Sequence, residues 1–138
     1  MSLYDRLRNK EFQNVIVLTG AGISTAAGIP DYRSMAGLFA GLDNPEETFV
    51  RSNANKLLEK VKETIDAAHQ KFDLFAPEYA FYRFCSWLQE EGILRRVYTQ
   101  NIDGLHLKAQ TGPPVDLVQE FHGNYQTDVV FYGEGISE

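Results

Sequence analysis

The first residues that could do chemistry lie in a glycine-containing segment directly after an apolar run. Val15–Leu18 is apolar and rich in β-branched residues, and Gly20–Ser24 follows with the sequence Gly-Ala-Gly-Ile-Ser. Glycine lets backbone N–H groups approach an anion, and a helix N-terminus favours negative charge, so this pattern suits phosphate binding. The usual dinucleotide fingerprint would place its third glycine at Thr25, whereas this chain has it at Gly28. The glycines alone are therefore equally compatible with a tight structural turn.

Two further polar groups follow apolar runs. Thr99–Asp103, at the end of the segment 95–99, has the sequence Thr-Gln-Asn-Ile-Asp. His122 follows the segment 116–121 and precedes a glycine. Imidazoles titrate near neutral pH, so His122 is a candidate general base. The alternatives are helix capping by Asn101 or Asp103 and an incidental loop position for His122.

Five other residues with polar or reactive side chains have simpler interpretations. Asp31 and Arg33 fit a solvated loop or a local ion pair. His69 falls on the polar side of a predicted helix, where we expect it to be solvated, and His106 is expected to start or cap a short helix. Cys85 lies on an apolar helix face, which favours a small core residue over a nucleophile.

The predicted strands place these polar groups at one edge of a sheet. Strands are expected at Val15–Leu18, Arg95–Thr99 and Asp116–Phe121. The first is a continuous apolar run, which is typical of a strand buried on both faces. Strands that alternate with helices indicate a mostly parallel α/β sheet with right-handed crossovers. The ligand crevice of such a sheet lies outside the carboxyl ends of its strands.

Three helices are expected between and beside these strands. Apolar residues at three-and-four spacing predict a long helix from Ala54 to Phe72. A second helix begins near Pro77 and ends at Gly92, because proline suits the first helical position and glycine the end. Its apolar face is predicted to comprise Phe81, Phe84, Cys85 and Leu88. A short helix is expected to open after the glycine turn and to end at Gly28–Asp31.

Composition limits the class of protein. The 138 residues are 43% hydrophobic and 23% charged, which is an ordinary balance for one modest globular core. A net charge of −6 and a pI near 5.0 give no basic surface, so we expect no nucleic-acid binding. No membrane span or signal peptide is predicted, so the expected location is intracellular, cytoplasmic or nuclear. The single cysteine excludes an internal disulfide and a four-cysteine zinc site built from this chain alone.

Taken together, the motifs resemble those of the sirtuins, the NAD-dependent protein deacylases. The matching segments occur in the family's order, at 20–24, 28–34, 99–106, 121–123 and 128–134. The resemblance implies a partial Rossmann-like α/β fold, a parallel sheet flanked by helices, and NAD-dependent protein-lysine deacetylase activity. Mono-ADP-ribosyl transfer or NAD hydrolysis on the same fold is one alternative. A catalytically silent NAD- or peptide-binding fragment is another.

The resemblance also implies roles for individual residues. The NAD phosphate region would be held by Ala21, Gly22 and Ser24, with Gly20 permitting the turn, and the cofactor loop would include Asp31, Tyr32 and Arg33. Gln100 and Asn101 would contact the nicotinamide ribose, Ile102 and Asp103 would line the nicotinamide pocket, and His122 would be the general base. An acyl-lysine peptide would lie against Val130, Phe131, Tyr132, Gly133 and Glu134.

The implied reaction needs orientation and polar contacts more than a strong nucleophile. In sirtuins the acyl oxygen of the modified lysine attacks C1′ of the ribose as nicotinamide leaves, and the products are free lysine, nicotinamide and an O-acyl-ADP-ribose. Family members that prefer negatively charged acyl groups carry a tyrosine and an arginine where this chain has Leu38 and Gly41. An unpaired buried carboxylate costs several kcal/mol, so we expect acetyl or another neutral acyl group.

The chain departs from the family pattern at two places. Sirtuins carry a small four-cysteine zinc module between the His-Gly motif and the substrate-binding strand, whereas only Asn124–Thr127 separates Gly123 from Asp128. We therefore expect residues 1–138 to represent one partial NAD-binding catalytic domain, with a gap after Thr127 and the C-terminal half missing after Glu138. A natural or engineered truncation is the other explanation. Zinc is implied by the family, but its cysteine ligands are absent from this sequence, and no oligomeric state is predicted.

Overall fold

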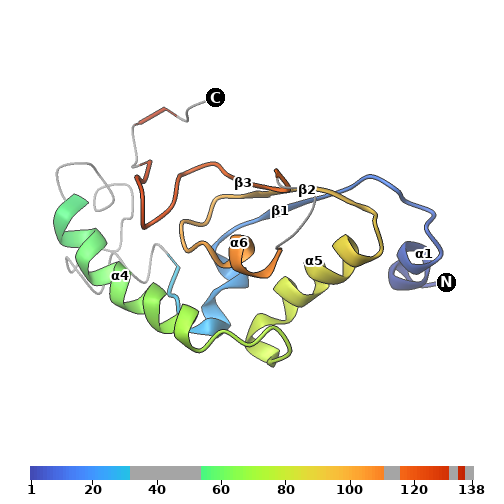
Figure 1. Cartoon of the computed structure of the whole chain (residues 1–138), viewed down its shortest axis with the longest axis horizontal. Helices are drawn as coiled ribbons and strands as arrows, with labels where there is room; N and C mark the ends of the chain where they lie inside the picture. The colour runs from blue at the N-terminus through green and yellow to red at the C-terminus, as the bar shows by residue number, and fades with distance from the viewer. Residues whose placement is uncertain (32–53, 111–115, 131–133, 136–138) are drawn as a thin grey trace.

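A parallel three-stranded sheet forms the centre of the molecule (Figure 1). The computed structural model describes residues 1–31, 54–110, 116–130 and 134–135. The strands are β1 (Val15–Thr19), β2 (Leu94–Thr99) and β3 (Val118–Glu120), in the order β1-β2-β3. Both pairings are parallel, with Thr19 opposite Thr99 and Thr99 opposite Glu120. The predicted parallel Rossmann-like sheet is confirmed, although its third strand is shorter than expected.

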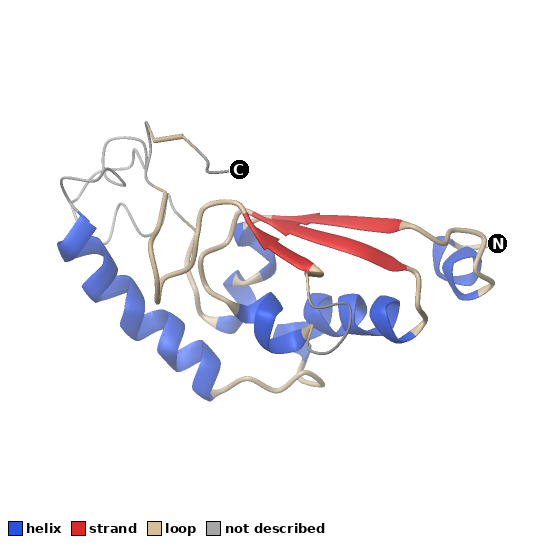
Figure 2. Cartoon of the chain, turned by 45° about the horizontal axis from the view of Figure 1, so that its top comes forward, coloured by secondary structure: helices blue, strands red, loops and turns tan. Residues whose placement is uncertain are grey.

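The helices lie on one side of this sheet and beyond its two ends (Figure 2). They are α1 (Leu3–Arg8), α4 (Ala54–Gln70), α5 (Ala80–Glu90) and α6 (Leu105–Ala109). Short 3-10 turns occur at η1 (Ala21–Ile23), η2 (Thr25–Ala27) and η4 (Pro77–Tyr79). The helix expected after the glycine turn is therefore two 3-10 turns, which Gly28 ends in the left-handed region at φ 92°. None of the described helices is long and apolar enough to cross a membrane.

One hydrophobic cluster joins α5 to the inner face of the sheet. Val17 and Val97 from the strands pack with Cys85 and Leu88 of α5, which confirms Cys85 as a core residue. The expected burial of Phe81 is wrong, because Tyr82 has no exposed surface whereas Phe81 is exposed. The buried stripe runs through Tyr82, Cys85, Ser86 and Leu88, the spacing of one helix face, and Phe81 lies beside that stripe.

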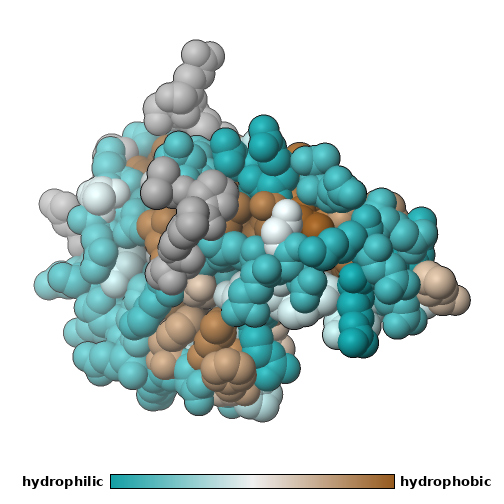
Figure 3. Space-filling model, turned by 45° about the vertical axis from the view of Figure 1, so that its right-hand side comes forward, coloured by the Kyte–Doolittle hydropathy of each residue, from teal (hydrophilic) through white to brown (hydrophobic). Residues whose placement is uncertain are grey.

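The outer face of β1 corrects a second expectation. Ile16 and Leu18 are 59% and 67% exposed, whereas Val17 and Thr19 are buried, so this strand is covered on one face only. Within the described residues, no helix lies over the outer face (Figure 2). Figure 3 shows apolar side chains among the hydrophilic ones on one side of the molecule.

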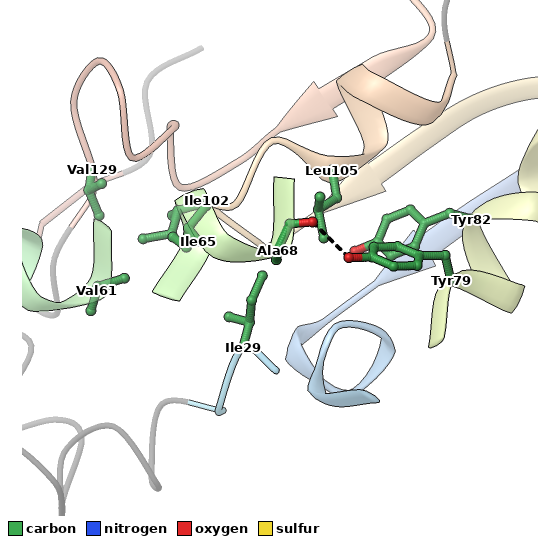
Figure 4. Packing of buried hydrophobic residues seen from close by; sticks show 9 residues of the cluster. All are labelled: Ile29, Val61, Ile65, Ala68, Tyr79, Tyr82, Ile102, Leu105 and Val129. Atoms are coloured by element: carbon green, nitrogen blue, oxygen red, sulfur yellow. Dashed lines mark hydrogen bonds between the residues drawn. The ribbon is translucent and has the colours of Figure 1, made fainter. Parts of the chain in front are cut away.

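A second cluster packs α4 against the loops at the carboxyl edge of the sheet (Figure 4). It joins Ile65 of α4 to Ile29, which follows η2, and to Ile102, which follows β2. Tyr79 is tied to the same helix because its hydroxyl donates to the backbone carbonyl of Ala68 at 2.7 Å. This core fixes the two loops whose polar residues could do chemistry.

Candidate functional site

The loops after β1 and β2 meet at the carboxyl edge of the sheet. The backbone N–H of Gln100 donates to the Thr19 carbonyl at 3.1 Å, and the Asn101 amide donates to the Gly20 carbonyl at 3.0 Å. Beside them lies a small pocket, with a volume of about 20 Å³, that opens to solvent. Its lining residues are Ala21, Ser24, Ile29, Pro30, Ile65, Asn101, Ile102 and Asp103.

Asn101 joins the two loops. Its side chain is nearly buried, and besides its bond to Gly20 its backbone N–H donates to the Thr99 hydroxyl at 3.1 Å. These two bonds fix the loop after β2 against the glycine turn after β1. The helix-capping alternative does not describe Asn101, because its amide bonds across the sheet edge to another loop.

Asp103 is a buried carboxylate at the pocket. Its Oδ2 accepts a hydrogen bond from the Ser24 hydroxyl at 2.8 Å, and its Oδ1 accepts one from the Leu105 N–H at 3.0 Å. The second bond is an Asx-type turn at the start of α6, whose N-cap is Gly104 and not Asp103. Asp103 therefore holds this helix start without capping it, and it also lines the pocket. Ser24 is 1% exposed, so its hydroxyl is directed toward this carboxylate rather than toward open solvent.

Open space beside two glycines fits the close approach of a ligand to the backbone. A Cβ atom added at Gly20 or Gly22 would meet no protein atom within 4 Å. The extended backbone of Gly20, with φ −135°, would also accept other residues. Since neither protein packing nor backbone geometry demands glycine at Gly20, the open space is consistent with a phosphate-binding turn.

His122 follows β3 and lies next to the loop after β2. Its Nδ1 donates to the backbone carbonyl of Gln100 at 3.2 Å, since a carbonyl oxygen can only accept. The lone pair of the neutral ring is then on Nε2, and the side chain is partly exposed. The backbone is held as well, because the carbonyl of His122 accepts from the Val130 N–H at 2.8 Å. This arrangement leaves Nε2 as the atom that could take up a proton.

His69 is not solvated as expected. Its Nε2 donates to the backbone carbonyl of Asp103 at 2.6 Å, and its ring lies 5.8 Å from that of Tyr125. The polar side of α4 faces the loops after β2 and β3, since the Tyr125 hydroxyl also donates to Asp66 of this helix at 3.1 Å. The backbone N–H of Tyr125 donates to the Ile102 carbonyl at 2.9 Å. Both contacts hold the segment that contains Ile102 and Asp103.

A closed turn connects Gly123 to Asp128. The Asn124 N–H donates to the Asp128 carbonyl at 3.1 Å, and the Asn124 side-chain oxygen accepts from the Gln126 N–H at 3.0 Å. Gly123 forms an antiparallel bridge with Val129.

No strand is formed by the described residues of the predicted substrate-binding segment. Several residues of the predicted sites lie outside the described residues, namely Tyr32, Arg33, Leu38, Gly41, Phe131, Tyr132 and Gly133, whereas Asp31 and Glu134 are described as exposed.

The residues present do not fit the zinc ion that the resemblance implies. Cys85 is the single cysteine of the chain, and it is buried in the core, where desolvation raises the pKa of its thiol to about 12. A thiol must lose its proton to bind zinc, and this environment opposes that. In the described segments, no group of three or more His, Cys, Asp or Glu side chains could hold a metal ion.

We therefore expect the purified chain to contain well below one equivalent of zinc. Elemental analysis by mass spectrometry would measure the metal, and a thermal melt with and without a chelator would test whether metal stabilises the fold. Both melting midpoints should coincide. Stoichiometric zinc together with a lower midpoint in chelator would contradict the assignment.

His106 is a buried residue whose role sequence reasoning missed. Its Nδ1 donates to the Gln110 side-chain oxygen at 2.6 Å, and its Nε2 lies 3.0 Å from the Thr19 hydroxyl. Thr19 in turn shares a 2.8 Å hydrogen bond with Thr99. The network connects the carboxyl ends of β1 and β2 with α6 beneath the site. The sequence signal for this pair was the spacing of four residues between His106 and Gln110, the residue at which α6 ends, because side chains four apart on a helix can contact each other.

Protonation of His106 should destabilise the fold. Burial lowers the pKa of this imidazole below its ordinary value of about 6.5. Below that value the unfolded chain binds a proton that the folded chain does not, so the stability contributed by neutral His106 decreases as pH falls. Urea midpoints measured between about pH 7.5 and about pH 5.5 should decrease less steeply for His106→Gln than for the unchanged protein. Equal pH slopes would contradict this interpretation.

The parallel sheet with polar loops gathered at its carboxyl edge defines a Rossmann-like α/β protein. The Sir2 family model matches residues 20–128, and the chain belongs to this family. It is 39% identical over 122 residues to NAD-dependent protein deacetylase 2 of Geobacillus kaustophilus. This match covers 86% of this chain and 47% of that protein. It is 36% identical over 129 residues to NAD-dependent protein deacetylase HST1 of Saccharomyces cerevisiae, covering 88% of this chain and 24% of that protein. The chain thus spans about half the length of the first relative and about a quarter of the second.

Solved structures of the family have the same fold. The structure of Sir2Tm bound to a propionylated peptide superposes with a TM-score of 0.64 at 26% identity, covering 97% of this chain and 64% of that one. A complex of Sir2 with a p53 peptide and NAD+ superposes with a TM-score of 0.58 at 33% identity, covering 90% of this chain and 47% of that one.

Proposed function

We propose that this chain is the NAD-binding catalytic part of an NAD-dependent protein-lysine deacetylase. The observation that carries the proposal is His122, whose Nδ1 donates to the carbonyl of Gln100, the residue directly before the pocket-lining Asn101. A histidine oriented in this way has its Nε2 available as a general base. The similarity to proteins named NAD-dependent protein deacetylases supports the same activity.

NAD would be held by the loops after β1 and β2. The open space beside Gly20 and Gly22 supports contact between the NAD phosphates and the backbone of Gly20, Ala21 and Gly22. Ser24 would act by orienting Asp103, because its hydroxyl already donates to that carboxylate. The remaining proposed contacts are Asp31, Tyr32 and Arg33 in the cofactor loop, Gln100 and Asn101 at the ribose, and Ile102 with Asp103 at the nicotinamide.

NAD when bound supplies the nicotinamide–ribose bond, whose cleavage is coupled to acyl transfer. The protein's own contribution is orientation and one proton transfer. Asn101, fixed by bonds to Gly20 and Thr99, would order the ribose. His122 would take up a proton from a ribose hydroxyl through Nε2, while its Nδ1 remains bonded to Gln100.

The proposed substrate is a protein or peptide that carries an acyl-lysine. Val130 and the residues after it would bind it, with Phe131 and Tyr132 beside the acyl chain and Gly133 and Glu134 at the peptide backbone. The known structures with a propionylated peptide and with a p53 peptide support this class of partner. The apolar Leu38 and the glycine at Gly41 favour neutral acyl groups.

We further propose that residues 1–138 belong to one catalytic domain and that the protein is intracellular, cytoplasmic or nuclear. No nucleic-acid or membrane partner is proposed.

Mass spectrometry of an acetyl-lysine peptide incubated with the protein and NAD tests the activity. Deacetylated peptide, nicotinamide and O-acetyl-ADP-ribose together are the expected products. ADP-ribose with an unchanged peptide would instead indicate NAD hydrolysis, and a peptide that gains ADP-ribose would indicate ADP-ribosyl transfer. Binding of NAD without any product would indicate a catalytically silent fragment.

A further inference from the structure

A buried tyrosine outside the recognised motifs lies beneath the candidate site. Tyr82 of α5 has no exposed surface, and its hydroxyl oxygen is 2.6 Å from the Ser24 hydroxyl oxygen. Ser24 in turn donates to Oδ2 of Asp103 at 2.8 Å. Three residues that are far apart in the sequence thus form one chain of hydrogen bonds that ends on a carboxylate at the pocket.

The direction of this chain follows from proton count. Ser24 has one hydroxyl proton, and it donates that proton to the Asp103 carboxylate, so the bond between Tyr82 and Ser24 has Tyr82 as its donor. Burial first, and the nearby charge of Asp103 second, raise the pKa of the Tyr82 hydroxyl far above its ordinary range. The tyrosine therefore keeps its proton and remains a donor near neutral pH.

The geometry leaves Asp103 little freedom. Its other oxygen, Oδ1, accepts from the Leu105 N–H at 3.0 Å, so both carboxylate oxygens have donors from the protein. Tyr82 is itself fixed, since its backbone carbonyl accepts from Gln110 at 3.0 Å and its ring lies 4.7 Å from that of His106. A rigid donor thus acts on Asp103 through one intervening hydroxyl.

We infer that Tyr82 is a positioning residue that orients the carboxylate of Asp103 for NAD binding by donating a hydrogen bond to Ser24. The inference rests on the proposed function, because it assigns Asp103 to the NAD site. It adds to that function a residue of α5 that lies outside the matching motifs. Removing the Tyr82 hydroxyl would leave the Ser24 oxygen without its donor and weaken the hold on Asp103.

Tyr82→Phe tests the inference, and Tyr79→Phe is the matched control. Both tyrosines are buried in the same cluster, and the Tyr79 hydroxyl also makes one buried bond, to the carbonyl of Ala68. Both variants should lose similar thermal stability. By calorimetric titration, Tyr82→Phe should bind NAD about 5–10-fold more weakly, the loss expected for one hydrogen bond, whereas Tyr79→Phe should bind NAD like the unchanged protein.

A double-variant cycle separates positioning from a general structural effect. If Tyr82 acts through Ser24, adding Tyr82→Phe to Ser24→Ala should weaken NAD binding no further than Ser24→Ala alone. Equal NAD affinity of the Tyr82→Phe and Tyr79→Phe variants, or additive losses in the cycle, would overturn the inference while leaving the proposed function standing. Failure of the unchanged protein to bind NAD would overturn the proposed function and this inference with it.

Discussion

His122→Ala is expected to lower the rate of NAD-dependent deacetylation by about 10²- to 10⁴-fold, the usual contribution of a general base. The imidazole is partly exposed, so its removal creates no large internal cavity. Its one described side-chain hydrogen bond runs from Nδ1 to the Gln100 carbonyl and orients Nε2. Loss of this single bond should affect catalysis more than the stability of the fold. Steady-state rates with an acetyl-lysine peptide and saturating NAD would measure the loss.

Two controls belong with this variant. Its thermal midpoint should stay close to that of the unchanged protein, and its affinity for NAD should change much less than its rate, since proton transfer is lost while Asn101 and Asp103 remain. Unchanged turnover would refute the general-base assignment of His122. A collapsed midpoint would show that the histidine is structural.

Gly123→Ala is expected to destabilise the protein by about 2–5 kcal/mol. Gly123 has φ 83°, in the left-handed region that costs other residues about 1–2 kcal/mol. A Cβ atom at this position would also collide with the backbone carbonyl oxygen of Asp128. Backbone cannot rotate away as a flexible side chain would, so the closed turn and its bridge to Val129 would have to open. Urea unfolding would measure the loss.

Gly92→Ala is the matched control for that collision. Gly92 also has a positive φ, 75°, but a Cβ atom there would meet nothing within 4 Å. It should therefore lose only the conformational cost of about 1–2 kcal/mol. Equal losses for the two variants would mean that the Asp128 carbonyl does not pack against Gly123 as described.

Local patterns were sufficient to predict the sheet but not which faces of its elements are covered. Val15–Thr19 forms a strand because its residues favour extended backbone, yet an apolar run has the same appearance whether one face or both are covered. Leu18 is accordingly exposed where burial was expected. The α5 sequence offers Phe81 and Tyr82 as adjacent aromatic residues, and the packing against neighbouring elements decides between them. That choice depends on tertiary contacts, which periodicity alone does not contain.

The candidate site was predictable where strand ends locate it. Asn101, Asp103 and His122 each follow a strand, and parallel strands end at the same edge of a sheet. His69 and Tyr82 were missed because their contacts with Asp103 and Ser24 span 34 and 58 residues of sequence. Such contacts arise from the way α4 and α5 dock beneath the loops, and no local motif contains that information.

Titration of the isotope-labelled protein with NAD, followed by amide NMR, tests most directly whether these loops form the cofactor site. We expect saturable chemical-shift changes at Ala21, Gly22, Asn101 and Asp103, with little change in the remote helix α1. Saturable changes confined to other parts of the chain, or none at any NAD concentration that saturates sirtuin enzymes, would contradict this expectation.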